Sequence, residues 1–345
     1  MVQRVRASVV AAPSASLINV VGAIVVAYVA VVAAQRIYHG GPVYFAQTLG
    51  FGLALGAIYA LVALGYTMVY GIIELINFAH GDVFTLGAFF SLALMPAFGL
   101  TEGKSSGIGL ILPLLGLFVV TMLFCAVVNV VIERVAYRPL RHAPRLAPLI
   151  TAIGMSTLLE GLMFVWKGPF NLHYPDLLPE TQVTIAPGVT IAAKALVVMG
   201  VALVLVIALT QFIGRSKLGK AMRATAQDRD AAQLMGIDIN RTISATFFIG
   251  AVLAGAGGII YGLYYNSVAA FDGFQYGLIA FTAAVFGGIG NIPGAALGGL
   301  IIGVVAAISD GYFAPAWTEV LIFSILIFVL VFRPTGLLGM RVPEK

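Results

Sequence analysis

One short stretch of the chain has the residue types and spacing of a phosphate-binding loop. In GRSKLGKA at 214–221, Gly214 is followed five residues later by Gly219 and then by Lys220. A Walker loop then needs Ser or Thr to ligate Mg²⁺, and a β-strand before the motif. Here the next residue is Ala221, and the preceding AKALVVMGVALVLVIALTQFI is too long and apolar for a central strand. The stretch therefore does not predict a nucleotide site, and its polarity needs another explanation.

The sequence contains no other catalytic or metal-binding pattern. The four histidines lie in separate connecting segments, and none has a second ligand type three or four residues away on a clear helix face, except that His80 is near Asp82. Gly-x-Ser-x-Gly and His-Glu-x-x-His are both absent from the sequence. We therefore expect a protein that is not an enzyme and that carries no metal or other cofactor.

A carboxylate inside an apolar run is a candidate for a transport function. Glu160, in LITAIGMSTLLEGLMFVW, lies roughly 18 Å from the inner end of that run at the helical rise of 1.5 Å per residue. A charge near the bilayer centre costs about 2.5 to 3.5 kcal/mol, so this side chain should face the helix bundle or a wet cavity. Snorkelling to the outer leaflet, or a local ion pair, explains its position equally well.

Two polar stretches interrupt apolar runs on what should be one side of the membrane. INFAHGD lies in the segment near 71–82, and GGIGNIPG occupies 287–294. Discontinuous helices beside a transport path have this pattern. The translocation-path candidates are therefore Asn77, His80, Asp82, Glu160 and Asn291. Plain turns explain both stretches about as well, with Asp82 as a helix N-cap and Pro293 as the first residue of a helix.

Membrane-spanning helices must position these side chains. The 345 residues are 61% hydrophobic and 10% charged, whereas soluble domains carry about 25% charged residues. Apolar runs of about 17 to 25 residues can cross the hydrocarbon layer. Such runs lie near 17–35, 46–70, 83–99, 109–132, 148–166, 190–213, 244–265, 293–312 and 316–332, with a shorter one at 275–290. The sequence thus predicts an all-α, polytopic membrane protein with about 8 to 10 transmembrane helices.

The positive charges are distributed unevenly between the connecting segments. If the chain crosses ten times with both termini inside, all 19 Lys and Arg residues except Arg36, Lys104, Lys167 and Lys194 fall on the inner side. This asymmetry marks the cytoplasmic side and predicts a cytoplasmic C-terminus. Nucleic acid is not an expected partner, because no basic stripe with interleaved aromatic residues is present.

The first 45 residues have features of two kinds of segment. The apolar run at 17–34 follows Arg4 and Arg6 and ends in small residues, as a cleaved secretory signal would. The run is long for a signal, which favours a retained transmembrane helix. We expect residues 1–45 to form an N-terminal extension with this extra transmembrane or signal-like helix, followed by a membrane domain over 46–345.

Small residues recur at every fourth position in several apolar runs. Examples are Gly52 with Gly56, and Gly299 with Gly303. In lipid such faces let helix backbones approach closely. Most of the 40 glycines are therefore expected to serve helix packing.

The polar stretch at 214–241 lies between two apolar runs. Its centre, AMRATAQDRDAAQLM, is rich enough in alanine to form a helix. Two weak apolar stripes are present, Leu218, Met222 and Ala226 in one and Ala231, Leu234 and Met235 in the other. The segment is too small for a core of its own. It could dock into a groove of another protein, and composition alone allows a solvated loop equally well.

Four blocks of the chain, in order, resemble a known family. They are GYTMVYGIIELINFAHGD, IERVAYRPLR, GKAMRATAQDRDAAQLMGI and FTAAVFGGIGNIPGAALGGLIIG. These blocks are similar to the LivH-type permease subunit of high-affinity branched-chain amino acid importers of the ATP-binding-cassette (ABC) class. The likeness extends from about Gly50 to Gly339.

The resemblance implies a permease subunit of a bacterial inner membrane, without an ATPase of its own. It implies three kinds of partner: a periplasmic binding protein that delivers Leu, Ile or Val, a second permease subunit, and two cytoplasmic ATPase subunits. It also implies that the polar stretch is an EAA-type coupling loop, whose helix sits in a cleft of an ATPase subunit. By position, the residues of that contact would be Gly219, Arg223, Ala224, Ala226, Asp228 and Gly236.

Other transport functions stay open. Importers of urea, short amides or other amino acids are the nearest alternatives, because INFAHGD does not distinguish them. A proton- or sodium-coupled secondary transporter would also fit Glu160 and the interrupted helices. Uptake that requires ATPases and a binding protein would exclude ion coupling.

Overall fold

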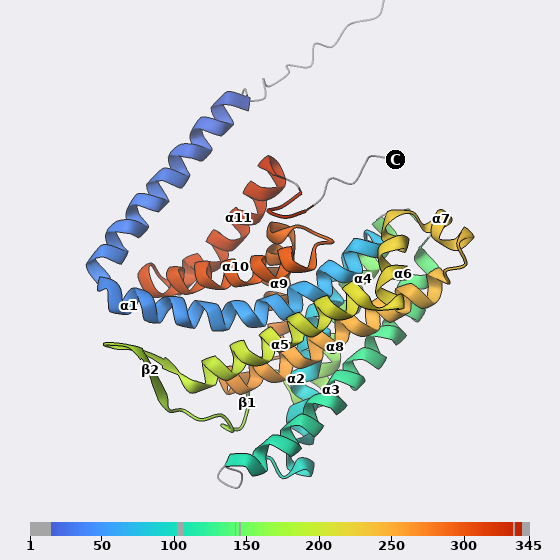
Figure 1. The fold of residues 1–345 in the computed structure, drawn as a ribbon, viewed down its shortest axis with the longest axis horizontal. Coiled ribbons are helices and arrows are strands. Elements are labelled where there is room, and N and C mark those ends of the chain that lie inside the picture. Colours follow the sequence, from blue (N-terminus) through green and yellow to red (C-terminus); the bar gives the residue numbers. More distant parts are fainter. Residues whose placement is uncertain (1–14, 102–106, 142, 145, 334, 340–345) are drawn as a thin grey trace, which may run out of the picture. The chain divides into compact units, whose positions relative to one another are not determined.

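The computed structural model describes residues 15–101, 107–141, 143–144, 146–333 and 335–339, with side chains from residue 34 onward (Figure 1). The helices are α1 (Ala15–Ile73), α2 (Ala79–Leu94), α3 (Ile111–Ile132), α4 (Leu146–Lys167), α5 (Ala193–Arg215), α6 (Lys217–Gln227), α7 (Arg229–Leu234), α8 (Ile239–Tyr265), α9 (Asp272–Gly287), α10 (Ile292–Tyr312) and α11 (Thr318–Phe332). Short helical turns are η1 (Met95–Phe98), η2 (Gly107–Leu110), the π-helical η3 (Glu133–Tyr137), η4 (Arg138–Leu140) and η5 (Pro315–Trp317). The strands are β1 (Leu172–His173), β2 (Gln182–Ala186), β3 (Val189–Ala192) and β4 (Ser267–Val268).

Contacts divide the chain into two units, Met1–Ala46 and Gln47–Lys345. In the first unit, α1 leaves helical geometry at Gly41 (φ 80°, ψ 161°), directly before Pro42. Glycine tolerates a positive φ, and proline has no backbone N–H to continue the helical hydrogen bonds. The apolar run near 17–35 belongs to the helical backbone before this interruption, and the side chains at 15–33 lie outside the described part.

Apolar membrane-length helices dominate the second unit. Among the described residues of the chain, eight helical stretches are long and apolar enough to cross a membrane. Helix α8 packs against α2 and α3, and α2 also packs against α4 and α9. Helices α3, α4, α5 and α11 instead expose many large apolar side chains, as lipid-facing helices do. The expectation of an all-α polytopic membrane protein is confirmed.

Both expected interruptions are present. Helix α1 ends at Ile73 and α2 begins at Ala79, so Asp82 lies in the first turn of α2 and is not its N-cap. Helix α9 ends at Gly287, and Asn291 caps α10, so Pro293 is the second helical residue and not the first. With 16 residues, α9 is also too short to cross the bilayer fully.

The predicted small-residue faces bring backbones together. A β-carbon built on Gly303 would lie 2.2 Å from Cα of Gly56, and one built on Gly299 would lie 2.5 Å from Cα of Ala60. No side chain fits such gaps, so α1 and α10 approach backbone to backbone. The packing role of these glycines is confirmed.

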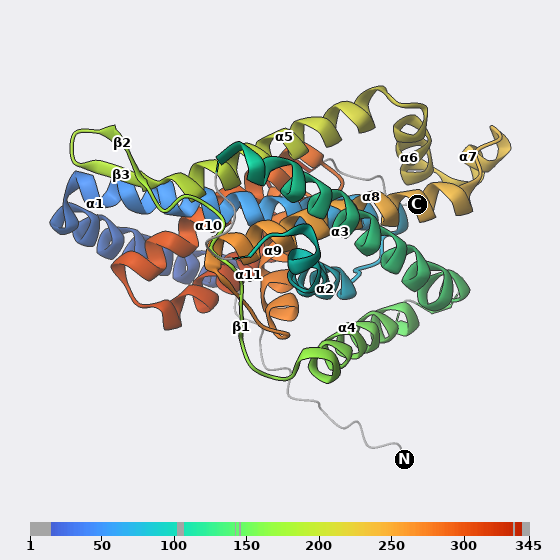
Figure 2. The same cartoon turned by 90° about the horizontal axis from the view of Figure 1, so that it is seen from below.

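Two kinds of non-membrane element lie at opposite ends of the second unit. The β2–β3 hairpin extends at one end, and α6 and α7 lie beyond the ends of α5 and α8 at the other, in both views (Figures 1 and 2). Strand β1 pairs antiparallel with β4. These strands were not expected from the sequence, because they are short and lie in polar connections.

Candidate functional site

The first interruption, between α1 and α2, contains a buried amide. Glu74 directly follows α1 and has a positive φ of 57°, which is uncommon for a residue other than glycine. Oδ1 of Asn77 accepts a 2.7 Å hydrogen bond from the hydroxyl of Tyr137 in η3. Nδ2 of Asn77 has no hydrogen-bond partner within the described ranges. A buried polar group without a partner costs about 1 to 3 kcal/mol, so an arrangement that supplies a partner for this amide would be favoured by that amount.

Two path candidates follow in the first turn of α2, and both are fully buried. The ring of His80 packs edge-on against Tyr66, with 4.9 Å between the ring centroids. Oδ2 of Asp82 accepts a hydrogen bond from the Ser156 hydroxyl on α4, whereas its Oδ1 makes none to another described residue. Glu160 lies one turn beyond Ser156 on α4 and is partly buried. The structure thus joins α2 to α4 at Asp82 and Ser156, one helical turn from Glu160.

The second interruption, between α9 and α10, is satisfied by hydrogen bonds. Gly288 (φ 112°) and Gly290 (φ 83°) adopt conformations that other residues rarely tolerate. Oδ1 of Asn291 accepts a 3.0 Å bond from the Gly294 amide and caps α10. Its Nδ2 donates a 2.7 Å bond to the Leu338 carbonyl. The side chain of Asn291 therefore links the start of α10 to the segment that follows α11.

The two interruptions are neighbours in space. A β-carbon built on Gly71, in the last turn of α1, would lie 3.0 Å from Cα of Gly290. The backbone amides of Leu337 and Leu338 bond to the carbonyls of Phe286 and Gly287 at 2.8 and 3.0 Å. Both breaks and the segment after α11 therefore meet at one end of the bundle.

The near-Walker stretch is two helices with one residue between them. Ser216 separates α5 from α6, and its hydroxyl accepts a 2.9 Å bond from the Gly219 amide. A β-carbon on Gly219 would lie 2.1 Å from the Ile213 carbonyl oxygen, so this glycine permits a close contact between α5 and α6. Its amide is occupied by the helix cap and does not point into a phosphate cradle.

The expected helix in the polar stretch is confirmed, but it is divided. Oδ1 of Asp228 accepts bonds from the amides of Asp230 (2.9 Å) and Ala231 (3.0 Å), which makes Asp228 the N-cap of α7. Aspartate is a preferred N-cap because it satisfies free amides at a helix start. Gly236 then has the left-handed φ of 82° that is common after a helix C-terminus.

Two arginines join this stretch to the bundle. Arg223 donates to the Ile213 carbonyl at the end of α5. Nη2 of Arg229 donates a 3.0 Å bond to the Ile72 carbonyl, at the end of α1 and next to the first interruption. A cation at a helix C-terminus satisfies free carbonyls and stabilises the helix dipole. The polar stretch is thus physically connected to the start of the first break.

The apolar residues of the stretch point in two directions. Met222 is buried against the core, Ala224 is half-buried and Ala226 is exposed. Leu234 and Met235 are 88% and 83% exposed at the end of α7. We call these two residues the exposed tip. Large apolar side chains that reach into solvent from a polar segment are typical of an interaction site.

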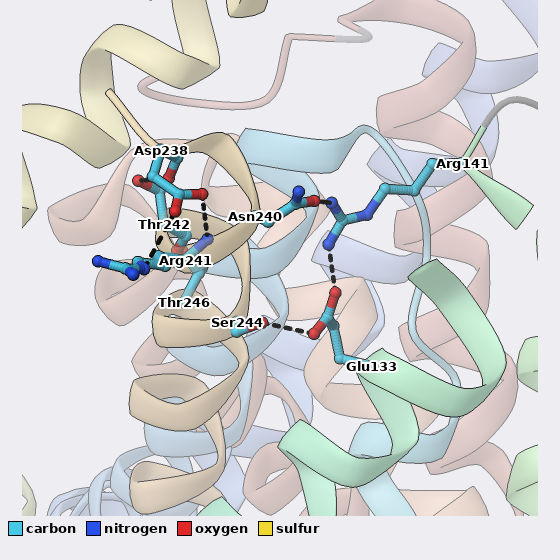
Figure 3. A network of polar contacts seen from close by, with 8 residues as sticks. All are labelled: Glu133, Arg141, Asp238, Asn240, Arg241, Thr242, Ser244 and Thr246. Carbon is cyan, nitrogen blue, oxygen red and sulfur yellow. Dashed lines mark hydrogen bonds and ion pairs between the residues drawn. The ribbon is translucent and has the colours of Figure 1, made fainter. Parts of the chain in front are cut away.

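A second polar network ties η3 and the residue after η4, Arg141, to the start of α8 (Figure 3). Glu133 is fully buried, and it accepts from Arg141 and, at 2.6 Å, from the Ser244 hydroxyl. Arg141 also donates a 2.6 Å bond to Oδ1 of Asn240. Burial lowers the pKa of Arg141 from its ordinary value, and the charge of Glu133 opposes that shift. The network fixes the end of α3 to α8.

Sequence reasoning did not single out Arg229 or Glu133. Glu133 follows an apolar run directly, as a solvated helix end would, and only its distant partners show that it is buried. Arg229 lies among other charged residues, and its partner is a backbone carbonyl 157 positions away. Neither contact leaves a local signal in the sequence.

A multi-pass helical bundle with two interruptions between helices and a folded polar segment is typical of membrane transport proteins. Residues 48–330 match the family described as branched-chain amino acid transport system / permease component. The chain belongs to this family. It is a transport subunit and not an enzyme, since its relatives are named as permease proteins.

Similar proteins cover nearly the whole chain. It is 42% identical over 316 residues to the high-affinity branched-chain amino acid transport system permease protein BraD of Pseudomonas aeruginosa, covering 90% of this chain and 99% of BraD. It is 41% identical over 305 residues to LivH of Escherichia coli, covering 88% of this chain and 98% of LivH. A shorter stretch, 37% of this chain, is 30% identical over 141 residues to 40% of a probable LivM permease of Methanocaldococcus jannaschii. No solved structure matches the chain.

Proposed function

We propose that this protein is the permease subunit of an ABC importer that moves branched-chain amino acids into the cytoplasm. The names of BraD and LivH, which align over about nine tenths of the chain, support the substrate class. The observation that carries the transport mechanism is the Arg229 hydrogen bond to Ile72, because it connects the polar stretch to an interrupted helix.

The partners we propose are a second permease subunit, two cytoplasmic ATPase subunits and a periplasmic binding protein. Residues 214–241 form the coupling loop, with the exposed tip seated in a groove of an ATPase subunit. Gly219, Asp228 and Gly236 shape the loop, Arg223 anchors it to α5, and Ala224 and Ala226 belong to the same surface. In this arrangement the loop, both interruptions and the C-terminus face the cytoplasm of a bacterium, across its inner membrane.

The coupling loop would transmit motion to the first interruption. When the ATPases close on ATP, a docked loop moves with them, and Arg229 pulls on the end of α1. Rigid-body shifts between two packings are a common form of such switching. Asn77, His80, Asp82 and Glu160 would then supply polar groups along the changing path, and Asn291 would keep the adjoining break in place. We assign residues 46–345 to this permease domain and residues 1–45 to an N-terminal extension.

The function is tested by uptake of labelled leucine into proteoliposomes that contain the complete importer. We expect uptake to require ATP, the ATPase subunits and the binding protein, and to persist without a proton or sodium gradient. Competition by urea, acetamide and other amino acids defines the substrate class. Uptake that follows an imposed ion gradient without ATP would contradict the proposal.

The coupling surface has its own test. We expect the double change Leu234→Asp and Met235→Asp to abolish copurification of the ATPase subunits, because it removes the apolar contact and adds charge. Gln227→Asp is the matched control, since it adds charge on the exposed surface of the same loop. Undiminished copurification by the double variant would rule out the exposed tip as the docking site.

A further inference from the structure

A large cavity lies between α3, α5 and α8 and is separate from the two interruptions. It has a volume of about 750 Å³, within the size range of ligand sites. Most of its lining is apolar, including Leu209, Phe212 and Leu253. Arg134 and Ser244 are the polar exceptions. No residue of the proposed path lines it.

The polar and apolar parts of this lining lie at different ends. On α8 the lining extends from Ser244 to Leu253, about 14 Å at 1.5 Å per residue. Helix α5 lies beside α8, and the last residue of α5 that lines the cavity is Phe212. Phe212 is close to the start of α6, so it lies at the same end of the cavity as Ser244. Arg134 lies in η3, whose Glu133 bonds to Ser244, and therefore belongs to this end too. The cavity is cationic at one end and apolar along its length.

The helices around the cavity turn apolar side chains outward. On α3 and η3 the residues Val131 and Val135 are exposed, and on α5 the residues Val204 and Ile207 are exposed. The lining residues Arg134 and Ala208 are exposed as well. The cavity is therefore open on a face whose surroundings match acyl chains, and water is not the solvent expected there.

The charge of Arg134 has no counterpart among the described residues. Arg134 makes no ion pair or hydrogen bond within the described part of the chain, whereas nearby Arg141 is held by Glu133. The Ser244 hydroxyl donates to Glu133 and can still accept a bond. A free guanidinium above an apolar channel matches a phosphate attached to acyl chains, because basic pockets between transmembrane helices on the cytoplasmic side bind anionic headgroups.

We propose that this cavity binds one anionic phospholipid of the cytoplasmic leaflet, with its phosphate on Arg134 and an acyl chain along Leu209 and Leu253. The assignment to this leaflet rests on the proposed orientation of the chain. Occupancy would brace the cytoplasmic ends of α3, α5 and α8 against one another, beside the start of the coupling loop.

The test measures lipid retained by the detergent-purified importer, using native mass spectrometry after exchange into phosphatidylglycerol or phosphatidylcholine. We expect the wild type to retain phosphatidylglycerol preferentially and Arg134→Gln to lower that retention about fivefold, while Arg134→Lys keeps most of it. Arg138→Gln is the matched control, because Arg138 is an exposed arginine four residues along that does not line the cavity. Equal retention by wild type and Arg134→Gln overturns the proposal.

A second variant tests the acyl-chain channel without changing charge. Ala208→Trp fills the cavity and should displace the lipid, whereas Ile207→Trp, on an exposed face of the same helix that does not line the cavity, should not. Unchanged retention in Ala208→Trp, or disulfide crosslinking of Ala208→Cys to the second permease, would also overturn the proposal. ATPase copurification, measured on the same samples, separates loss of lipid from failure of the proposed importer assembly.

Discussion

The two interruptions differ in how their ends are held, although they lie side by side. At the first, Asn77 and Asp82 are buried with polar atoms that have no partner among the described residues. At the second, Asn291 uses both ends of its amide, one for α10 and one for the Leu338 carbonyl. The first break also receives a hydrogen bond from the coupling loop through Arg229. The second receives hydrogen bonds from the segment after α11, at Phe286 and Gly287.

This difference indicates separate mechanical roles. Unsatisfied buried groups lower the cost of rearrangement, because a second arrangement can supply the missing partners. At the second interruption the amide of Asn291 already has its partners and glycines bring the backbones of α9 and α10 close together. A rearrangement there would supply no missing hydrogen bond. We therefore expect the first interruption to move during transport while the second stays fixed beside it.

The largest effect is expected from a side chain at the second interruption. A β-carbon on Gly287 would lie 2.0 Å from the Gly294 carbonyl oxygen, so Gly287→Leu must separate α9 from α10. Overpacking typically costs about 1 to 3 kcal/mol, and a backbone contact cannot relax as a side chain does. We expect little monodisperse protein in size-exclusion chromatography.

Gly154→Leu is the control for that change, because a β-carbon there meets nothing within 4 Å and the residue is exposed. It should behave as the wild type. If Gly287→Leu yields stable protein with full uptake, the second interruption is not the fixed one.

The next effect concerns the connection to the first interruption. Arg229→Gln removes the charged donor to the Ile72 carbonyl. A hydrogen bond to a charged group contributes about 1.5 to 3 kcal/mol, so uptake of leucine should fall about tenfold or more. ATPase copurification should stay normal, since the exposed tip is unchanged.

Arg241→Gln provides the comparison within the same region. Arg241 is exposed and pairs with Asp238 within one helical turn, so its loss should change uptake little. Equal uptake by Arg229→Gln and Arg241→Gln would show that the Ile72 contact does not transmit motion.

The sequence alone predicted the helices and their interruptions better than it predicted the contacts between them. The two breaks, the apolar helices and the glycine faces follow from local pattern, since each is a property of a few consecutive residues. Asn291 was expected as a path residue, and the structure shows that it is also a helix cap. The sequence GNIPG contains a local signal for this cap, because Asn is a preferred N-cap and Pro is favoured in the first turn of a helix. The Arg229 to Ile72 bond and the buried Glu133 depend on residues far apart in the chain, and no periodicity encodes such pairs.

A smaller effect is expected from the cap of the second interruption. Asn291→Ala removes both amide hydrogen bonds, and loss of an N-cap costs about 1 kcal/mol. For a chain of this size the melting temperature should fall by about 1 to 2 °C. Asn291→Asp keeps the acceptor for Gly294, so it should recover part of the loss. Uptake per folded molecule should not change, and a strong loss of uptake by both variants would instead make Asn291 part of the path.

The smallest effect is expected from Glu160, which lies on α4 near the first interruption. Glu160 is only partly buried, and it lies on α4 one helical turn from Ser156, which donates a hydrogen bond to Asp82. Glu160→Gln keeps the polar shape and should leave leucine uptake within about twofold, because an amide can still hydrogen-bond in the path. Glu160→Leu removes that capacity and should lower uptake further, with normal assembly of the importer. Equal uptake by the two variants would place Glu160 outside the path, and the moving region would then be confined to the residues of α1 and α2 around the break.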